Sequence, residues 1–342
     1  MALRFERREK VARYLDPRAA FAEAAVACEI RRDPLTGRSG RVAHVLGFQV
    51  QPVAFDPLIE ASRVGCPFCP ARVFAVTPRF PEEVTPAGRI VRGETVLVPN
   101  LAPYDEHSAV AVMSHAHYVP MAEFTALLLQ DAFEACRAYF RDVQRLPATT
   151  YGLVFWNYMP ASGGTQIHPH LQLFATDTPG NALEEELAAS ARYLASEGRP
   201  YWQDLLEAEE TLGERFVARR THTAWLTSFV SQSLLADLLI LFPGQRTLTT
   251  LPEAALAEFC GELRQVLRAL AAQGIYSFNL GVFPGVPERE DCWLHMRLSP
   301  RVYMTPRLWG TDTSALQHLY QEHFMVQTPE AAAQALRAAL PW

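Results

Sequence analysis

Three polar side chains at a spacing of two residues are the feature of this sequence best suited to chemistry. They are His168, His170 and Gln172, and residues 171–175 around the last of them show the alternating hydrophobicity of a half-buried β-strand. Side chains two residues apart on a strand point to the same side, so we expect two imidazoles and an amide on one face. Such a face can attack and bind a phosphoryl group. The alternative is an exposed polar face without a chemical role.

A loop of small residues precedes this row and follows an apolar, β-prone segment at 151–156. Its sequence is Ser162, Gly163, Gly164 and Thr165. Glycines let the main chain come close to a bulky anion, and uncovered N–H groups and hydroxyls donate hydrogen bonds to it. A Gly-Gly pair is also common in ordinary turns. Next to the histidine row, it favours an anion-binding loop.

A second motif, C-x-x-C, has the spacing of a metal-binding knuckle. Cys66 and Cys69 can bring two thiolates to one tetrahedral ion, although such a pair also occurs as a redox motif or by chance. The chain has no second C-x-x-C, so two further ligands would have to be histidine or carboxylate. His115 and His117 follow a predicted strand at 108–113, and both are candidates.

These motifs resemble the histidine-triad superfamily, and within it the galactose-1-phosphate uridylyltransferase branch. That branch carries an Asn, a Gly/Ser-rich loop and then His-Pro-His-x-Gln, which here are Asn157, residues 162–165 and residues 168–172. The segment 31–37 also looks like the R-x-x-P-L-T-G segment near the start of uridylyltransferases. A weaker resemblance runs from about Ile30 to the end of the chain.

The resemblance implies roles for the site residues. His170 is the expected nucleophile, which forms a covalent nucleotidyl-histidine, and Gln172 is expected to bind the phosphoryl oxygens. For attack, one ring nitrogen of His170 must be unprotonated, so the other should donate to a backbone carbonyl. The residues expected to bind substrate are Asn100, Asn157, Ser162, Gly163, Gly164, Thr165 and Gln172.

The resemblance also implies a zinc site. In the family's register His117, not His115, is the ligand that joins Cys66, Cys69 and His168. Two thiolates and two imidazoles fill a tetrahedral shell and leave no position for water, so the zinc is expected to be structural.

An iron site that some relatives carry is not expected here. In those relatives a Glu after the active-site strand joins histidines of the second half of the chain. Only His295 matches such a histidine, because Arg297 stands where another would be and Gly281 lies near the third position. We therefore interpret the glutamates at 184–186 as a solvated helix face.

The order of predicted elements indicates an α+β fold with two similar halves. Each half reads strand, strand, long helix, strand, strand, and the resemblance implies two tandem HIT-like domains, residues 1–196 and 197–342. Each domain is an antiparallel sheet with a packed long helix. The second is degenerate, with Leu294–Leu298 in the position of the histidine row. Residues 1–27 are predicted to form two short helices. The predicted strands are 96–100, 108–113, 151–156, 171–175, 224–230, 238–242, 276–283 and 292–298, and the long helices are 120–145 and 252–273.

The composition limits the class of protein. The chain has 342 residues and a formal net charge of −6, which argues against a general nucleic-acid-binding protein. Lys10 is the only lysine, so a phosphate-binding cation has to be arginine or histidine. The charged start at 1–13 is unlike a signal peptide, and no run of about twenty apolar residues predicts a membrane span. We therefore expect a cytoplasmic protein with reduced cysteines and no membrane partner.

Two enzymatic functions fit these residues. The first is a nucleotidyltransferase like those of galactose metabolism. It moves a nucleoside monophosphate between a nucleotide sugar and a sugar 1-phosphate. The second is a phosphorylase or hydrolase of nucleotide sugars or dinucleotides that uses the same histidine. A non-catalytic nucleotide-binding protein is disfavoured by the presence of His168, His170 and Gln172 together. A homodimer is implied by the resemblance alone.

Overall fold

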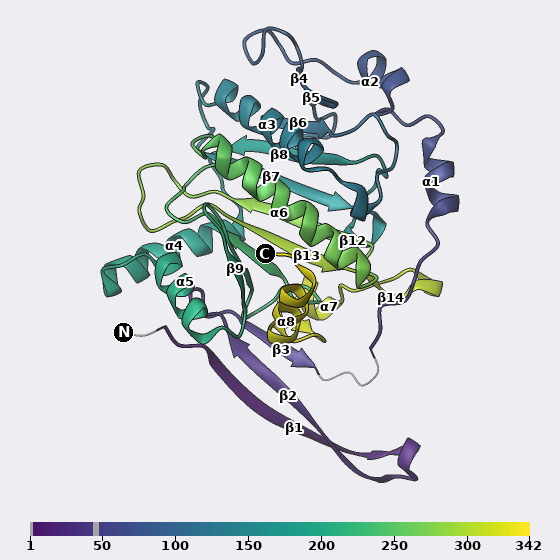
Figure 1. Cartoon of the computed structure of the whole chain (residues 1–342), viewed down its shortest axis with the longest axis vertical. Helices are drawn as coiled ribbons and strands as arrows, with labels where there is room; N and C mark the ends of the chain where they lie inside the picture. Colours follow the sequence, from purple (N-terminus) through teal and green to yellow (C-terminus); the bar gives the residue numbers. More distant parts are fainter. Residues whose placement is uncertain (1–2, 44–47) are drawn as a thin grey trace.

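A single ten-stranded antiparallel sheet forms the body of the protein. The computed structural model describes residues 3–43 and 48–342. The strand order is β4-β5-β6-β8-β7-β12-β13-β11-β10-β9, and two long helices, α3 (Ala126–Val143) and α6 (Glu253–Ala272), cover one face of this sheet (Figure 1). The strands are β4 (Ile90–Arg92), β5 (Thr95–Pro99), β6 (His107–Val112), β7 (Tyr151–Tyr158), β8 (His170–Thr176), β9 (Phe216–Arg219), β10 (Ala224–Thr227), β11 (Leu238–Leu241), β12 (Ser277–Phe283) and β13 (His295–Arg301).

The two halves of the sheet repeat one topology. The first half contributes β4-β5-β6-β8-β7 and the second β9-β10-β11-β13-β12, and the halves meet where β7 pairs with β12. In each half the long helix lies between the second and third of its four principal strands in the sequence. The predicted α+β class with two similar halves is therefore confirmed. The boundary near residue 196 stays a prediction, since the sheet is continuous and α4 (Asn181–Glu197) crosses it.

The core lies between the sheet and the two long helices. Helix α3 begins where the Thr125 hydroxyl accepts a hydrogen bond from the Leu128 N–H, a typical N-cap. Its buried side includes Phe133, whose ring meets the edge of Phe259 of α6 at 5.5 Å. Each such buried phenylalanine contributes about 1.5–3 kcal/mol to folding. This packing holds the two halves together under the sheet.

The prediction of two short helices in the first 27 residues is wrong. Strands β1 (Glu6–Asp16) and β2 (Ala22–Arg32) form a hairpin that extends from the body (Figure 1). It belongs to a four-stranded sheet in which β3 (Ser39–Ala43) pairs with β2 and with β16 (His323–Met325). Alanine favours helix locally, but pairing on the neighbouring strand overrides that preference.

The remaining elements surround the ends of the main sheet. Helix α5 packs on the face of β10 and β11 that α6 leaves open. In the part of the chain that the structure describes, no helix is long and apolar enough to cross a membrane. These elements are α1 (Asp56–Arg63), α2 (Pro70–Val76), α5 (Tyr201–Leu212), β14 (Tyr303–Thr305), β15 (Gly310–Thr311), α7 (Ala315–His318) and α8 (Pro329–Ala339), with 3-10 turns at 17–19, 121–123, 160–162 and 306–308.

Candidate functional site

The histidine row lies on the face of the sheet opposite the long helices. On β8, Leu171 and Leu173 are fully buried in the core, whereas His170 and Gln172 point to the other face. Strand β8 begins at His170, so His168 precedes the strand. His170 and Gln172 share one face of the strand as predicted, and His168, just before the strand, turns toward a cysteine cluster whose Phe68 ring contacts both histidines.

Four potential metal ligands gather beside the start of β8. One ligand atom from each of Cys66, Cys69, His117 and His168 lies within 4.8 Å of the others. The Sγ atom of Cys69 is 3.5 Å from Nδ1 of His117 and 3.8 Å from Nδ1 of His168, and Sγ of Cys66 is 3.7 Å from the latter nitrogen. Two sulfurs and two imidazole nitrogens form a donor set that can hold one tetrahedral metal ion.

The outer nitrogens of both histidines are held by other groups. Nε2–H of His168 donates to the carbonyl oxygen of Ser114 at 2.7 Å, and Nε2 of His117 lies 3.0 Å from the Ser62 hydroxyl. A proton on Nε2 of His168 leaves the Nδ1 lone pair directed at the thiols, which is how metal-bound histidines are oriented. Burial lowers the pKa of His168 to about 4 and also lowers the pKa of His117, so both rings are neutral.

His115 lies outside the cluster. Its side chain is 62% exposed, and its Nδ1 is 3.9 Å from Glu94. Burial and the neighbouring Cys66 raise the pKa of the Cys69 thiol. A cation between the two sulfurs would reverse that effect, because it stabilises thiolates. The residues therefore fit a metal, and they fit it with His117.

His170 has the orientation that a nucleophile requires. Its Nδ1–H donates to the carbonyl oxygen of His168 at 2.8 Å, and burial lowers the pKa of its ring. Among the described residues, no hydrogen bond is made to Nε2 of His170. The Phe68 ring, within the C-x-x-C motif, lies 5.3 Å from the imidazole. The cysteine cluster thus supports the His170 ring through a carbonyl and an aromatic contact.

The loop before the row is shaped by its two glycines. Gly163 has φ +85°, the left-handed conformation that glycine adopts without strain. A Cβ added to Gly164 would lie 2.9 Å from the carbonyl oxygen of Asn157 and 3.1 Å from that of Met159. The loop can therefore pack this closely on the end of β7 only with glycine at position 164, and Thr165 follows as the chain turns toward His168.

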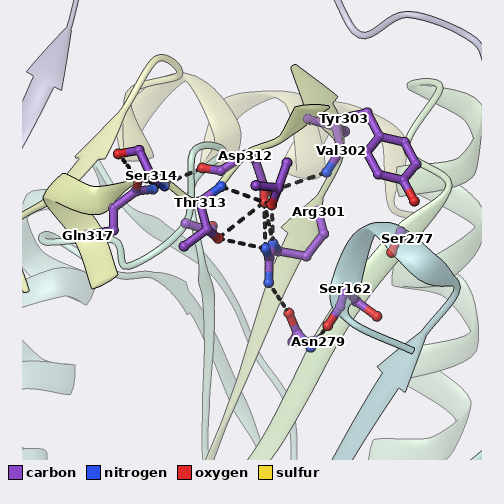
Figure 2. Close-up of polar contacts among 12 residues, drawn as sticks. Ser162, Ser277, Asn279, Arg301, Val302, Tyr303, Asp312, Thr313, Ser314 and Gln317 are labelled. Carbon is purple, nitrogen blue, oxygen red and sulfur yellow. Dashed lines mark hydrogen bonds and ion pairs between the residues drawn. The ribbon is translucent and has the colours of Figure 1, made fainter. Parts of the chain in front are cut away.

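Asn157 is held by residues that the sequence did not single out. Nδ2 of Asn279 on β12 donates to Oδ1 of Asn157 at 2.6 Å and to the carbonyl oxygen of Ser162 at 2.9 Å. Nη1 of Arg301 on β13 donates to Oδ1 of Asn279 at 2.5 Å, and its other nitrogens bind Asp312 (Figure 2). These contacts join residues 11 to 122 positions apart in the sequence, and no motif spacing marks them.

The other predicted binding residues are placed less tightly. Oε1 of Gln172 is buried and has no hydrogen-bond partner in the described part of the chain. Asn100 follows β5, two strands from β8, and its Oδ1 accepts from the Ala102 N–H as in a turn.

The interpretation of residues 184–186 as a solvated face is wrong for Glu186. Its carboxylate is 2.5 Å from Nη2 of Arg297 and 3.2 Å from Nε2 of His295, and the residue is 5% exposed. Burial alone would raise the pKa of Glu186, but Arg297 and His295 outweigh it and hold that pKa below its usual value. Trp202 covers the His295 ring at 4.2 Å.

The same contacts correct the alignment of the second half. His295 and Arg297 of β13 lie on the open face, whereas Leu294, Met296 and Leu298 are buried in the core beneath α6. The open-face positions that His170 and Gln172 hold on β8 are therefore matched by His295 and Arg297. The predicted correspondence with Leu294–Leu298 is out by one residue.

Two hollows lie on or beside the open face. One, of about 820 Å³ with open solvent included, is lined by Trp202 and Arg297 and lies over the second half, away from His170. The other, of about 530 Å³ measured in the same way, is lined by Asn279, Arg301 and other polar side chains. Through Asn279 this second hollow adjoins the glycine loop.

Comparisons with known proteins identify the fold. No family model matches the sequence. An uncharacterized protein from Archaeoglobus fulgidus is 29% identical over 255 residues, which are 75% of each chain. A solved uridylyltransferase mutant has a TM-score of 0.66 and 20% identity, with 91% of this chain and 98% of that chain covered. The chain has the uridylyltransferase fold.

Two structures from Arabidopsis thaliana support the same conclusion. A GalT-like protein has a TM-score of 0.69 at 15% identity, with 92% of this chain and 99% of that chain covered. An ADP-glucose phosphorylase with bound ADP-glucose has the same TM-score and identity, with 91% and 98% covered. The predicted resemblance to the galactose-1-phosphate uridylyltransferase-like branch of the HIT-like superfamily is thus confirmed for the fold.

Proposed function

We propose that the protein is a nucleotidyltransferase that moves a nucleoside monophosphate between a nucleotide sugar and a sugar 1-phosphate through His170. The observation that carries this proposal is the hydrogen bond from Nδ1–H of His170 to the His168 carbonyl. It places the proton on Nδ1 and leaves the Nε2 lone pair free to attack phosphorus. The low pKa caused by burial keeps the ring in that form.

The chemistry proceeds in two displacements. The Nε2 lone pair of His170 forms a bond to the α-phosphorus, and the bond from that phosphorus to the bridging oxygen breaks. The sugar 1-phosphate leaves with the electron pair. A second sugar 1-phosphate then attacks the nucleotidyl-histidine and releases Nε2, so one difficult transfer becomes two easier ones. Gln172, Asn157 and the backbone N–H groups of the loop at 162–165 bind the phosphoryl oxygens as charge develops.

Zinc is the metal proposed for the cluster of Cys66, Cys69, His117 and His168. With four protein ligands the ion supplies structural support only, because no coordination position is left for substrate. The residues around it do the positioning. His168 offers its carbonyl to His170, and Phe68 packs on the same ring. The site thereby fixes the direction of the attacking nitrogen.

A second candidate is a phosphorylase that uses the same covalent histidine. The shared fold with an ADP-glucose phosphorylase favours it. The first displacement is identical, and inorganic phosphate replaces the sugar phosphate as acceptor in the second. Both candidates take a nucleotide sugar as donor, and both fit a cytoplasmic enzyme.

A homodimer is part of the proposal. The tip of the β1–β2 hairpin leaves apolar side chains in solvent, with Leu15 62% and Phe21 64% exposed. An isolated two-stranded ribbon is marginally stable in water, so a second copy of the chain is a suitable cover for it. Sedimentation analysis of the purified protein tests this, and a strictly monomeric chain at micromolar concentration would contradict it.

The covalent step can be tested by trapping label on the protein. UDP-glucose, UDP-galactose and ADP-glucose labelled at the α-phosphorus should each be incubated with wild type and with His170→Ala. We expect label from at least one donor on the wild type and none on the variant. His115→Ala is the matched control, because this exposed ring lies outside the cluster, and it should label normally. If the wild type takes no label from any donor, the proposal is wrong.

The acceptor then separates the two candidate functions. Labelled protein, freed of donor, is mixed with glucose 1-phosphate, with inorganic phosphate or with buffer alone. A transferase releases label as a nucleotide sugar only with the sugar phosphate. A phosphorylase releases it as a nucleoside diphosphate with phosphate.

A further inference from the structure

A chain of hydrogen bonds connects the C-terminal segment to the glycine loop. It begins at Asp312, which is 3% exposed and accepts from Nε of Arg301 at 2.8 and 3.0 Å. Arg301 donates to Asn279, and Asn279 donates to the Ser162 carbonyl (Figure 2). Asn279 also donates to Oδ1 of Asn157. The chain crosses three neighbouring strands, β13, β12 and β7, on the open face.

Two groups of fixed hydrogen-bonding character, the Arg301 guanidinium and the Ser162 carbonyl, set the direction of the bonds in this chain. A guanidinium can only donate hydrogen bonds, so the Asn279 atom that it contacts must be the carbonyl oxygen. The amide nitrogen of Asn279 then faces Asn157, which has to present its own oxygen at 2.6 Å. The amide nitrogen of Asn157 is left as a donor. Either orientation of the two amides would satisfy the Asn157–Asn279 bond taken alone, so the choice is made by Arg301 and by the Ser162 carbonyl, which can only accept.

The second hydrogen of the Asn279 amide acts on the loop. It binds the Ser162 carbonyl oxygen at 2.9 Å and so holds that oxygen toward β12. A carbonyl oxygen turned into a phosphate site would repel the anion, whereas N–H groups attract it. The Asn279 side chain therefore orients both the Asn157 amide and the Ser162 carbonyl.

We propose that Asn279 and Arg301 are positioning residues for nucleotidyl transfer, which act by fixing the Asn157 amide with its NH₂ group toward the phosphoryl oxygens. This inference rests on the proposed function. Neither residue touches the reacting atoms, and both act through Asn157 and the Ser162 carbonyl. Asp312 holds Arg301 in place and neutralises its charge, so the arginine orients amides and does not serve as a phosphate ligand.

A purely structural role would predict a different behaviour. Asp312 also accepts from the Val302 N–H, and its carbonyl accepts from the Gln317 amide, so it ties residues 302–317 to the sheet. If that were the whole function, only variants that weaken the fold would lose activity. A variant that keeps the fold and reverses the amides distinguishes the two.

Asn279→Asp is that variant. Its carboxylate still accepts from Arg301 as a charge-assisted bond, which offsets the lost bond to the Ser162 carbonyl, so thermal stability should change little. It cannot donate, so Asn157 must turn its NH₂ group toward position 279 and its oxygen toward the substrate. We expect the single-turnover rate of His170 labelling to fall about ten- to a hundredfold, the effect of one hydrogen bond to a charged group.

Ser299→Asp controls for added negative charge. Ser299 pairs with Asn279 across β12 and β13, and it takes no part in the chain of bonds. This variant should lose far less rate than Asn279→Asp. Combining Asn157→Ala with Asn279→Asp should lose less rate than the two single losses added together, because Asn279 acts in part through Asn157. Equal losses in both aspartate variants, additive losses in the double variant, or a labelling rate of Asn279→Asp within twofold of wild type would each overturn the inference.

Binding provides a readout that does not depend on the covalent step. Calorimetry compares UMP with uridine and AMP with adenosine on wild type and Asn279→Asp. Wild type should bind at least one monophosphate about tenfold more tightly than its nucleoside, and the variant should lose that difference. If wild type takes no label but shows this pattern, the proposed function fails while the positioning role stands. If the difference is absent in wild type or persists in the variant, the positioning role fails.

Discussion

Nδ1 of His170 lies 2.8 Å from the carbonyl oxygen of His168, and Nδ1 of His168 itself faces two cysteine sulfurs. The backbone carbonyl of His168 thus orients the ring of His170, the proposed nucleophile. The two histidines have different places in the site. His168 belongs to the cluster, and His170 faces the open side of the sheet. In the proposed mechanism only His170 bonds to phosphorus, and His168 acts by holding the His170 ring.

Removal of the metal should therefore reduce labelling of His170 without touching that residue. Purified protein is expected to contain about one zinc per chain, and Cys69→Ser should lose most of it, because thiolates are the stronger ligands of the set. We expect Cys69→Ser to label at least tenfold more slowly and to melt at a lower temperature. Metal analysis by plasma emission and the trapping assay measure the two effects.

The control for this change is Cys28→Ser. Cys28 is a free, half-buried cysteine on the β2 strand of the hairpin, away from the cluster. It should keep its zinc and its labelling rate. Full labelling of His170 in zinc-free wild type would contradict the proposal that the metal cluster positions this residue.

Gln172 is expected to stabilise charge on the phosphoryl group. Its Oε1 is buried and lacks a partner among the described residues, and its neighbour on the same face of β8 is His170. Gln172→Glu replaces a donor by a negative charge next to the developing anion. The labelling rate should fall by about a hundredfold or more, as for the loss of an oxyanion donor. Gln130→Glu, on the far helix α3, should not change it.

Gly164 should tolerate no side chain. A Cβ there would lie 2.9 Å from the Asn157 carbonyl oxygen, so Gly164→Ala has to displace the loop from β7. We expect a labelling rate at least tenfold lower with only a small change in melting temperature, because the loop is a local feature. Gly261→Ala in α6 meets no atom within 4 Å and should raise helix stability by about 0.5–1 kcal/mol. Equal labelling rates for Gly164→Ala and wild type would contradict the proposed role of the loop at 162–165 in binding the phosphoryl oxygens.

Much of the fold follows from local patterns in the sequence. The buried strands and the two long helices were predictable because their apolar residues recur with a period of two or about four. The hairpin at β1 and β2 was not, because alanine-rich segments favour helix in isolation. Its strand state depends on contacts with residues about three hundred positions away, such as the ion pair of Arg31 with Glu330 at 2.9 Å.

The candidate site likewise contains residues that the sequence reveals and residues that it does not. His168, His170 and the C-x-x-C pair carry a spacing that reflects their chemistry, so the sequence reveals them. Asn279 and Arg301 carry none, since their function depends on register across β7, β12 and β13. Glu186 was misjudged because its helix pattern shows neighbouring glutamates but not the Arg297 partner on β13.

Removing one member of the buried pair of Glu186 and Arg297 should destabilise the fold much more than replacing both members with leucine. Arg297→Leu leaves the buried carboxylate without its cation and should lower the free energy of unfolding by about 3–5 kcal/mol. The double variant Glu186→Leu with Arg297→Leu removes both charges and should recover most of that loss. Urea denaturation followed by tryptophan fluorescence measures both. A double variant less stable than Arg297→Leu would show that the pair is needed for more than charge balance.

Glu330 should make stability depend on pH in the acid range. Burial alone would raise its pKa, but hydrogen bonds from Arg31 and Arg215 outweigh it and lower the pKa to about 2 from the ordinary 4.5. A folded pKa below the unfolded value means that the unfolded chain takes up the proton more readily. The contribution of Glu330 is therefore complete above about pH 5 and is lost as the pH falls from 4.5 toward 2.

Glu330→Gln should remove that part of the pH dependence. The variant is expected to be less stable than wild type at pH 7, and the difference should shrink steadily between pH 5 and pH 3, as followed by urea unfolding at each pH. Glu60→Gln is the matched control. Its partner Arg63 and its own side chain are 50% and 69% exposed, and such surface pairs contribute little. A difference between Glu330→Gln and wild type that stays constant from pH 7 to pH 3 would place the source of acid sensitivity elsewhere, because only the ionised carboxylate binds both arginines.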